Sequence, residues 1–286
     1  GNNTSGNISG SITVNVNWDG NCPNSYLGNV FGGGNLATFG TTESPKAPTV
    51  NILNGTVSGN VYGGGKGDPT DHIKGQVTGN PIVTIGDTTK LTDDNVKAVV
   101  LGDVYGGGDA GNVVGTPQVN VINKCNTEIA NVYGGGNAAD VDGTDVNIDG
   151  GNIPGMVFGG GHGDKDSTPQ KQADVNGNVA VDVTGGTINK VFGGSNSKGN
   201  ITGTVTLNIA KGANSCDMKI NEVYGGGNEA AGNAGTITIG CTGDFENNGE
   251  GIVNVYGGAN AANINNNISL LIKGGHIDNV YGGNNT

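Results

Sequence analysis

The 286-residue chain contains no arginine, and charged residues make up only 13% of it. Its 25 acidic and 13 basic residues, all of the latter lysines, give a formal net charge of −12. An acidic chain without guanidinium groups repels phosphates and cannot bind them in a bidentate manner, which argues against nucleic-acid binding. No run approaches the ~18 consecutive apolar residues of a membrane-spanning helix, so we expect no membrane span.

Proline is scarce as well, with 8 residues, and the glycines do not recur at every third position. These two features exclude a collagen-like triple helix. What the chain has in excess is glycine, with 58 residues, and asparagine, with 43. The glycine share is about three times the usual one. Both residues are poor helix formers, so a long helical protein is excluded too.

A Val-aromatic-Gly-Gly unit recurs nine times along the chain. Its copies start 25 to 43 residues apart, which indicates a fixed structural turn with loops of variable length. We expect the aromatic rings to stack as a ladder that fills one corner of the core, and a sugar-binding strip is the alternative. The rings belong to Phe31, Tyr62, Tyr105, Tyr133, Phe158, Phe192, Tyr224, Tyr256 and Tyr281.

Short runs of alternating apolar and polar residues lie between the aromatic units, as at Val146, Asn147 and Ile148. Alternation of this kind, rich in β-branched residues, predicts a strand with one buried face. A Gly-Gly step often follows, as at Gly150 and Gly185. Three short strands per cycle of 25 or more residues, with no helix between them, predict an all-β fold. We expect a single-stranded parallel β-helix, or solenoid, of about nine coils and three short strands per coil. At ~4.8 Å per coil the rod would be about 43 Å long.

The glycines suit corners that bend the backbone within one or two residues, often at positive φ. Asparagine is the next best residue in that conformation and can stack into side-chain amide ladders. On these repeats the sequence resembles the right-handed parallel β-helix folds, in particular the Gly/Asn-rich repeats of bacterial surface adhesin-like proteins. The resemblance covers Ser11 to Gly283. It implies a structural or adhesive protein that is secreted or cell-surface-bound and contacts a glycan or a host or cell-surface protein.

Neither end of the chain carries the polar cap that a solenoid needs. We therefore expect residues 1–286 to be a single solenoid segment of a longer repeat protein. Uncapped coils also predict self-association through the open ends of the solenoid.

The four cysteines are Cys22, Cys125, Cys216 and Cys241. Cys22 and Cys125 lie three predicted coils apart, about 14 Å along the axis, which is too far for a disulfide. Cys216 and Cys241 belong to neighbouring coils and are the candidate disulfide. Unpaired small residues in the core or at corners are the alternative. No Cys/His ligand spacing indicates a zinc site.

The loops that follow the aromatic units contain the candidate ligand-contacting residues. Three of these loops are long, at residues 35–48, 66–80 and 162–178, and the first two should lie side by side. Insertions at one corner of a solenoid commonly build its binding face. Surface excursions without function are the alternative. The candidate residues are Asp68, Asp71, His72, His162, Asp164 and Asp166.

Asp140, Asp142 and Asp145 form a candidate calcium site, because closely spaced carboxylates on a glycine-rich turn suit Ca²⁺. A solvated acidic surface is the alternative, and the sequence indicates no other metal or cofactor. Around His162, the Gly-His-Gly run is similar to that of β-helical polygalacturonases, but their other active-site motifs have no match. His162 also occupies the position that Asn137 holds in the preceding copy.

We therefore name no catalytic residue, and the absent arginine argues against the proton abstraction used by pectate-lyase-like enzymes. The sequence favours a structural or adhesive rod that displays loops over an enzyme. The alternative is a carbohydrate-active β-helix, either a glycan-binding module or a polysaccharide hydrolase or lyase. Paired carboxylates facing each other ~5 to 9.5 Å apart in a groove would favour the hydrolase.

Overall fold

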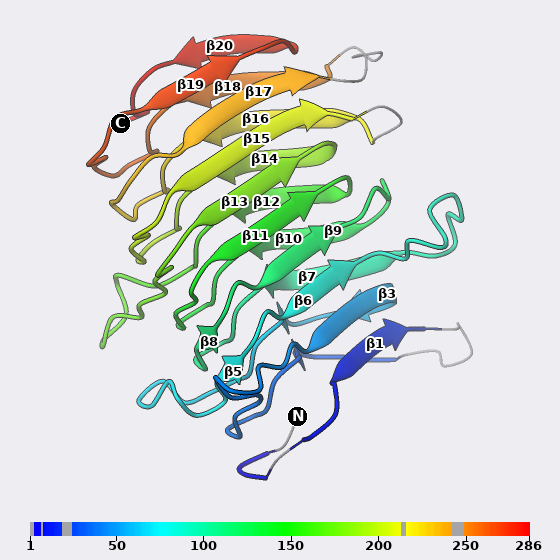
Figure 1. The fold of residues 1–286 in the computed structure, drawn as a ribbon. Helices are drawn as coiled ribbons and strands as arrows, with labels where there is room; N and C mark the ends of the chain where they lie inside the picture. Colours follow the sequence, from blue (N-terminus) through cyan, green and yellow to red (C-terminus); the bar gives the residue numbers. More distant parts are fainter. Residues whose placement is uncertain (1–2, 7, 19–24, 213–215, 242–248) are drawn as a thin grey trace.

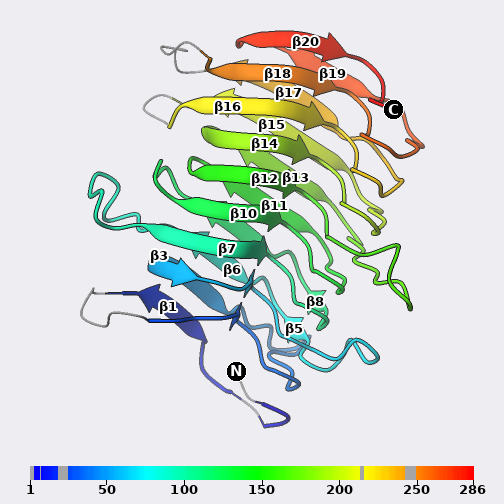
Figure 2. The ribbon, with the colours of Figure 1, turned by 180° about the vertical axis from the view of Figure 1, so that it is seen from behind.

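A computed structural model of the chain describes residues 3–6, 8–18, 25–212, 216–241 and 249–286, without the side chain of Cys241. This part contains no helix, and its strands pair in parallel into stacked sheets. The chain winds nine times around one axis, with its N- and C-termini at opposite ends (Figure 1). The strands nearest the viewer run to the right in Figure 1, and the strands of the opposite side, nearest the viewer in Figure 2, also run to the right. In both views the chain rises from the N- to the C-terminus, so the coil is right-handed. The predicted all-β parallel solenoid is confirmed.

Each coil begins with a strand of the first sheet, called sheet A, and we number the coils 1 to 9 accordingly. These are the alternating strands that the sequence predicts, paired in register from coil to coil. Sheet A consists of β1 (Thr13–Asn17), β3 (Thr49–Val57), β6 (Ile82–Ile85), β9 (Gln118–Val121), β11 (Thr144–Ile148), β13 (Val179–Val183), β15 (Val205–Lys211), β17 (Thr236–Cys241) and β19 (Ser269–Ile272).

The second sheet, called sheet B, contains the Val-aromatic units, and the last three residues of β3 also pair into it. Its strands are β2 (Val30–Phe31), β4 (Val61–Tyr62), β7 (Ala98–Tyr105), β10 (Glu128–Tyr133), β12 (Asn152–Phe158), β14 (Gly186–Phe192), β16 (Met218–Tyr224), β18 (Gly251–Tyr256) and β20 (Ile277–Tyr281).

The third side of each coil is mostly a single paired residue rather than the predicted third strand. Within the described part of the chain, only β5 (Val77–Thr78) and β8 (Val113–Val114) extend to two residues there. The reason is length, because in coil 4 the chain has only residues 137–143 between its Gly-Gly turn and β11. From coil 1 to coil 6 the paired residues form one column: Phe39, Val77, Val113, Val141, Val175 and Ile201.

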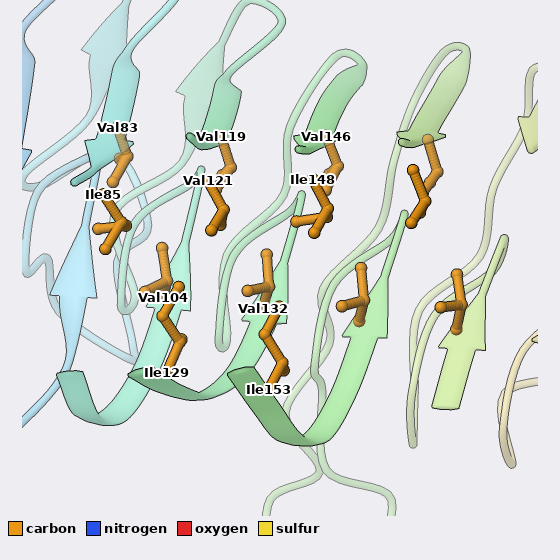
Figure 3. Packing of buried hydrophobic residues seen from close by; sticks show 14 of the residues in the cluster. Val83, Ile85, Val104, Val119, Val121, Ile129, Val132, Val146, Ile148 and Ile153 are labelled. Atoms are coloured by element: carbon orange, nitrogen blue, oxygen red, sulfur yellow. The ribbon is translucent and has the colours of Figure 1, made fainter. Parts of the chain in front are cut away.

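The core is a narrow column between the two sheets. In β11 the side chains of Val146 and Ile148 are fully buried, whereas Asn147 between them faces outward. Figure 3 shows such residues of sheet A pointing toward those of sheet B, for example toward Val132 and Ile153. Burying each such side chain contributes about 1.5–3 kcal/mol, so stability grows with the number of coils while the thickness of the core stays constant.

The glycines of the Val-aromatic-Gly-Gly turns are required by close approach rather than by positive φ. A Cβ on Gly106 would lie 2.3 Å from the carbonyl oxygen of Gly134 in the next coil, and the same contact recurs at Gly134 with Gly159. None of these turn glycines has a positive φ. The prediction that corners need glycine is therefore right at these turns for a different reason, namely that the coils stack backbone on backbone.

Candidate functional site

The nine predicted aromatic rings form one continuous stack on the outward side of sheet B. Neighbouring centroids lie 4.7–5.0 Å apart, and the ring planes are tilted by at most 13°. The six rings from Tyr62 to Tyr224 are at most 2% exposed. A sugar cannot stack on faces that neighbouring rings already cover, so this column supports packing and not the alternative of a sugar-binding strip.

The tyrosine hydroxyls at the edge of the ladder are enclosed by polar side chains. Tyr62 donates to Asp109 Oδ1 at 3.3 Å and accepts from Asn60 Nδ2 at 2.9 Å, and Tyr105 donates to Asp103 at 3.0 Å. Burial raises the pKa of Tyr62 and Tyr105 well above the usual range. These phenols are therefore neutral structural groups.

A ladder of polar side chains follows the Gly-Gly turns, and His162 belongs to it. Asn137 Nδ2 donates to Asp109 Oδ1 in the coil before it at 2.8 Å, and His162 Nδ1 donates to Asn137 Oδ1 at 2.8 Å. The predicted amide stacking is also present from Asn196 to Asn285. His162 packs against the Tyr133 ring with centroids 5.1 Å apart, and burial lowers its pKa. Its position is that of a packing residue.

The first long loop of interest, residues 66–77, folds over the short corner of coil 3. His72 Nδ1 donates to the carbonyl oxygen of Ala110 at 2.6 Å, which anchors the loop. Asp68 accepts a hydrogen bond from the Thr70 hydroxyl at 2.7 Å and pairs with Lys74 at 2.9 Å. The hydrogen bond from Thr70 is the main reason why the pKa of Asp68 is lowered. Asp68 therefore shapes the turn, whereas the half-exposed Asp71 lies at its surface, 3.7 Å from Lys74.

The second loop, residues 162–175, repeats this design on coil 6. Asp164 Oδ1 accepts the N–H groups of Asp166 and Ser167, and the hydrogen bond from Asp166 lowers the Asp164 pKa. Gly163 has a φ of 57°, and a Cβ there would lie 1.6 Å from the carbonyl oxygen of Lys198. Only glycine allows this loop to lie so close to the next coil. The Asp166 side chain is 79% exposed.

The structure thus brings the predicted loop residues together only within each loop. Loop 66–77 belongs to coil 2 and loop 162–175 to coil 5, and the short corners of coils 3 and 4 separate them. The expected neighbours, loops 35–48 and 66–80, do lie side by side, because Gly67 N–H donates to Asn35 O and Lys46 N–H donates to Thr78 O.

A pocket of about 320 Å³ opens where loop 162–175 meets the corners of coils 6 and 7. Sequence reasoning did not identify it, because its residues come from three coils and are far apart along the chain. The only sequence signal is the concentration of lysines around this loop. The polar lining consists of Lys165, Gln172, Ser197, Lys198, Asn200 and Glu229.

The predicted calcium ligands do not converge. Asp145 lies in sheet A and accepts from Gln118 Nε2 at 3.0 Å, whereas Asp140 lies on the third side and accepts the Asp174 N–H at 2.8 Å. Burial raises the pKa of both Asp140 and Asp142. Among the described residues no group of three or more His, Cys, Asp or Glu side chains could hold a metal ion. The calcium site proposed from spacing is therefore wrong.

Cys216 is bonded to Cys125 and not to Cys241, which corrects the predicted disulfide. The two residues stand 91 positions and three coils apart, yet their Cα atoms are 5.4 Å apart. The prediction was wrong because it compared only distances along the axis. Both cysteines lie at the corner between sheets A and B, and they meet beside the Gly-Gly corner of coil 5. A Cβ on Gly150 would lie 2.8 Å from Cys216 Sγ.

The residue next to Cys125 anchors another inserted segment at the same corner. Lys124 is only 2% exposed, and its ammonium donates to the carbonyl oxygens of Lys90 and Asp93 at 2.8 Å each. These hydrogen bonds hold loop 87–96 of coil 3 against coil 4. Together with the disulfide they tie coils 3 to 7 along one edge of the rod.

Comparison of the chain with protein-family models, with curated proteins and with solved structures gave no match. The described residues contain no helix with the length and hydrophobicity to cross a membrane. The chain is therefore classified by its fold, as a parallel β-solenoid.

Proposed function

We propose that the chain is a rigid structural or adhesive segment of a secreted or cell-surface bacterial protein. The solenoid sets the length and stiffness, and the loops at its third side contact a glycan or a protein. The observation that carries this proposal is the construction of loops 66–77 and 162–175. Each has its own internal hydrogen bonds and docks on the following coil, so it presents a fixed surface at little entropic cost on binding.

The disulfide supports an extracellular setting. Disulfides persist in oxidising compartments and are rare in the reducing cytosol. The Cys125–Cys216 bond joins coils 4 and 7 across the two coils between them, and it ties the rod along its axis. A protein that carries load between a cell and a surface benefits from such a bond, because the tied coils cannot separate individually.

The experiment compares the intact chain with two short-corner variants on an array of glycans and extracellular-matrix proteins. In one variant Ala-Gly-Asn, the corner of coil 3, replaces residues 67–76. In the other, Ala-Ala-Asp, the corner of coil 4, replaces residues 163–174. Both keep the polar ladder and the third-side valine. Loss of a binding signal with either variant is expected, provided that the melting temperature is retained. Equal binding by all three proteins, or none by any, would refute the display role.

A carbohydrate-active enzyme is the second candidate, and one observation favours it. Asp140 is half-buried with a raised pKa, and the next residue in its ladder, Asp174, is also a carboxylate. However, Asp140 accepts the N–H of Asp174, and Asp174 accepts that of Asn200 at 2.6 Å, so both act as ladder rungs. Asparagine occupies the same position at Asn112 and Asn200, so Asp140→Asn should fold. Turnover of polysaccharides by the wild type that disappears in Asp140→Asn would establish the enzyme, and no turnover by the wild type would end it.

Self-association through the ends of the solenoid is the third candidate. The last coil exposes Ile272, Val280 and Tyr281 by 41–48% each, although the equivalent residues of inner coils are buried. A second copy stacking on this coil would cover them with the same coil-to-coil contacts that recur inside the chain. Sedimentation at rising concentration tests this, and a strictly monomeric profile would count against it. In an associating chain, Val280→Lys should restore the monomer.

A further inference from the structure

The pocket beside loop 162–175 is lined by two lysines and one carboxylate, and the two lysines differ in whether they have a charged partner. Lys165 is compensated, because its ammonium lies 3.1 Å from Asp166 and 3.8 Å from Glu229. Lys198, which is half-buried and lines the same pocket, makes no ion pair or side-chain hydrogen bond within the part of the chain that the structure describes.

The rest of the lining suits hydroxyl groups. Gln172 and Asn200 supply carboxamides, Ser197 supplies a hydroxyl, and Glu229 supplies a carboxylate that accepts hydrogen bonds. The remaining contacts are small residues, among them the buried Gly199 and Ala230. With about 320 Å³ the pocket lies within the range of small-molecule sites, which is roughly 300–1,000 Å³.

The walls of the pocket are positioned by the fold. Gln172 Nε2 donates to Asp174 Oδ1 at 2.5 Å, and the Lys165 N–H donates to Ser197 Oγ at 3.2 Å. The pocket is thereby formed before any ligand arrives, which lowers the entropic cost of binding. The aromatic ladder is closed, so recognition here rests on charge and hydrogen bonds.

We propose that this pocket binds an acidic sugar unit of the uronate type. The sugar carboxylate pairs with the Lys198 ammonium, and the sugar hydroxyls bond to Glu229, Gln172 and Asn200. A charge-assisted bond of this kind separates an acidic sugar from its neutral counterpart. The proposal rests on the display function of loop 162–175 and specifies its ligand.

The test is calorimetric titration of the whole chain with galacturonate oligomers and, as a matched probe, with neutral galactose oligomers. The wild type should bind the acidic oligomer and bind the neutral one at least about tenfold more weakly, as expected for one charge-assisted bond. Lys198→Gln should abolish that preference. Lys171→Gln is the matched control, because Lys171 lies on the same loop, carries the same charge and is not part of the pocket lining.

The outcomes separate this proposal from the display function. Equal binding of acidic and neutral oligomers, or an unchanged preference in Lys198→Gln, overturns the uronate site. So does the same loss of preference in Lys171→Gln, because the effect would then be general electrostatics. Absence of uronate binding, combined with an array signal that the 163–174 replacement removes, overturns the uronate site but leaves the display function intact. Binding of peptides with a free carboxylate in preference to uronates would assign the pocket to a protein partner and overturn the proposal.

Discussion

Replacing Cys216 by serine should destabilise the middle of the rod, and the magnitude follows from the chain that the disulfide encloses. For a separation of 91 residues, the loop-closure estimate is about 15.5 cal/mol/K, or ~4.6 kcal/mol at 25 °C. Repeat proteins need not unfold in one step, because each coil contacts only its neighbours. The loss should therefore be concentrated in coils 4 to 7, which the bond ties together.

The assay is guanidinium unfolding combined with amide hydrogen exchange of the wild type, Cys125→Ser, Cys216→Ser and the double variant. Each single variant should show the full loss, and the double variant should lose no more, because either substitution already removes the bond. Reduced wild type should match the double variant. Protection should fall in coils 4 to 7 and persist in coils 1 to 3.

Two results would refute this reasoning. The first is a non-reducing peptide map without the Cys125–Cys216 cross-link. The second is equal unfolding midpoints for the oxidised wild type and the variants. Additive losses in the two single variants would also contradict it, because they would mean that the cysteines stabilise the fold separately, as buried side chains do.

The aromatic ladder, the buried lysine and the buried histidine give further predictions. Phe192→Ala removes a fully buried ring and should cost about 3–5 kcal/mol in the free energy of unfolding, and a loss below about 1 kcal/mol would show that the ladder is dispensable. Lys124→Met should raise hydrogen exchange in loop 87–96, whereas the control Lys90→Met should not, because Lys90 contributes only its carbonyl oxygen. Burial lowers the pKa of His162, so the unfolded state binds its proton more readily. The contribution of neutral His162 to the free energy of unfolding should be fully present above the unfolded pKa of about 6.5. It should decrease as the pH falls toward the lower folded pKa. His162→Asn should flatten this dependence of the melting temperature on pH, and superimposable profiles of the variant and the wild type would contradict it.

The features that repeat from coil to coil could be predicted from the sequence. The alternating strands, the aromatic column and the amide ladder follow from stacking, because a position that recurs in the sequence must contact its own copies in a solenoid. Asn137, Asp109 and His162 illustrate this, since sequence placed them at one position and the structure joins them by hydrogen bonds.

The features that occur once could not be predicted, because they depend on which corners of different coils come into contact. The Cys125–Cys216 bond crosses two coils whose corners are reduced to glycine, and spacing along the axis does not reveal that contact. A signal was nevertheless present, since the Gly-Gly steps at Gly150 and Gly185 lie between the two longer, cysteine-bearing corners. Bare corners flanked by long ones are where chain segments of a solenoid can meet across several coils.

The candidate ligand residues show the same division between repeated and unique features. Asp68 and Asp164 both follow a positive-φ glycine that comes directly after the polar ladder, and both form turns. Their equivalence was visible in the sequence as Gly-Asp at the same position of two loops, and it points to a structural role. Residues without an equivalent in other coils, such as Lys198, are free of that constraint. In a repeat protein, a site for one ligand must therefore be sought where the repeat is broken, and the pocket beside loop 162–175 is such a place.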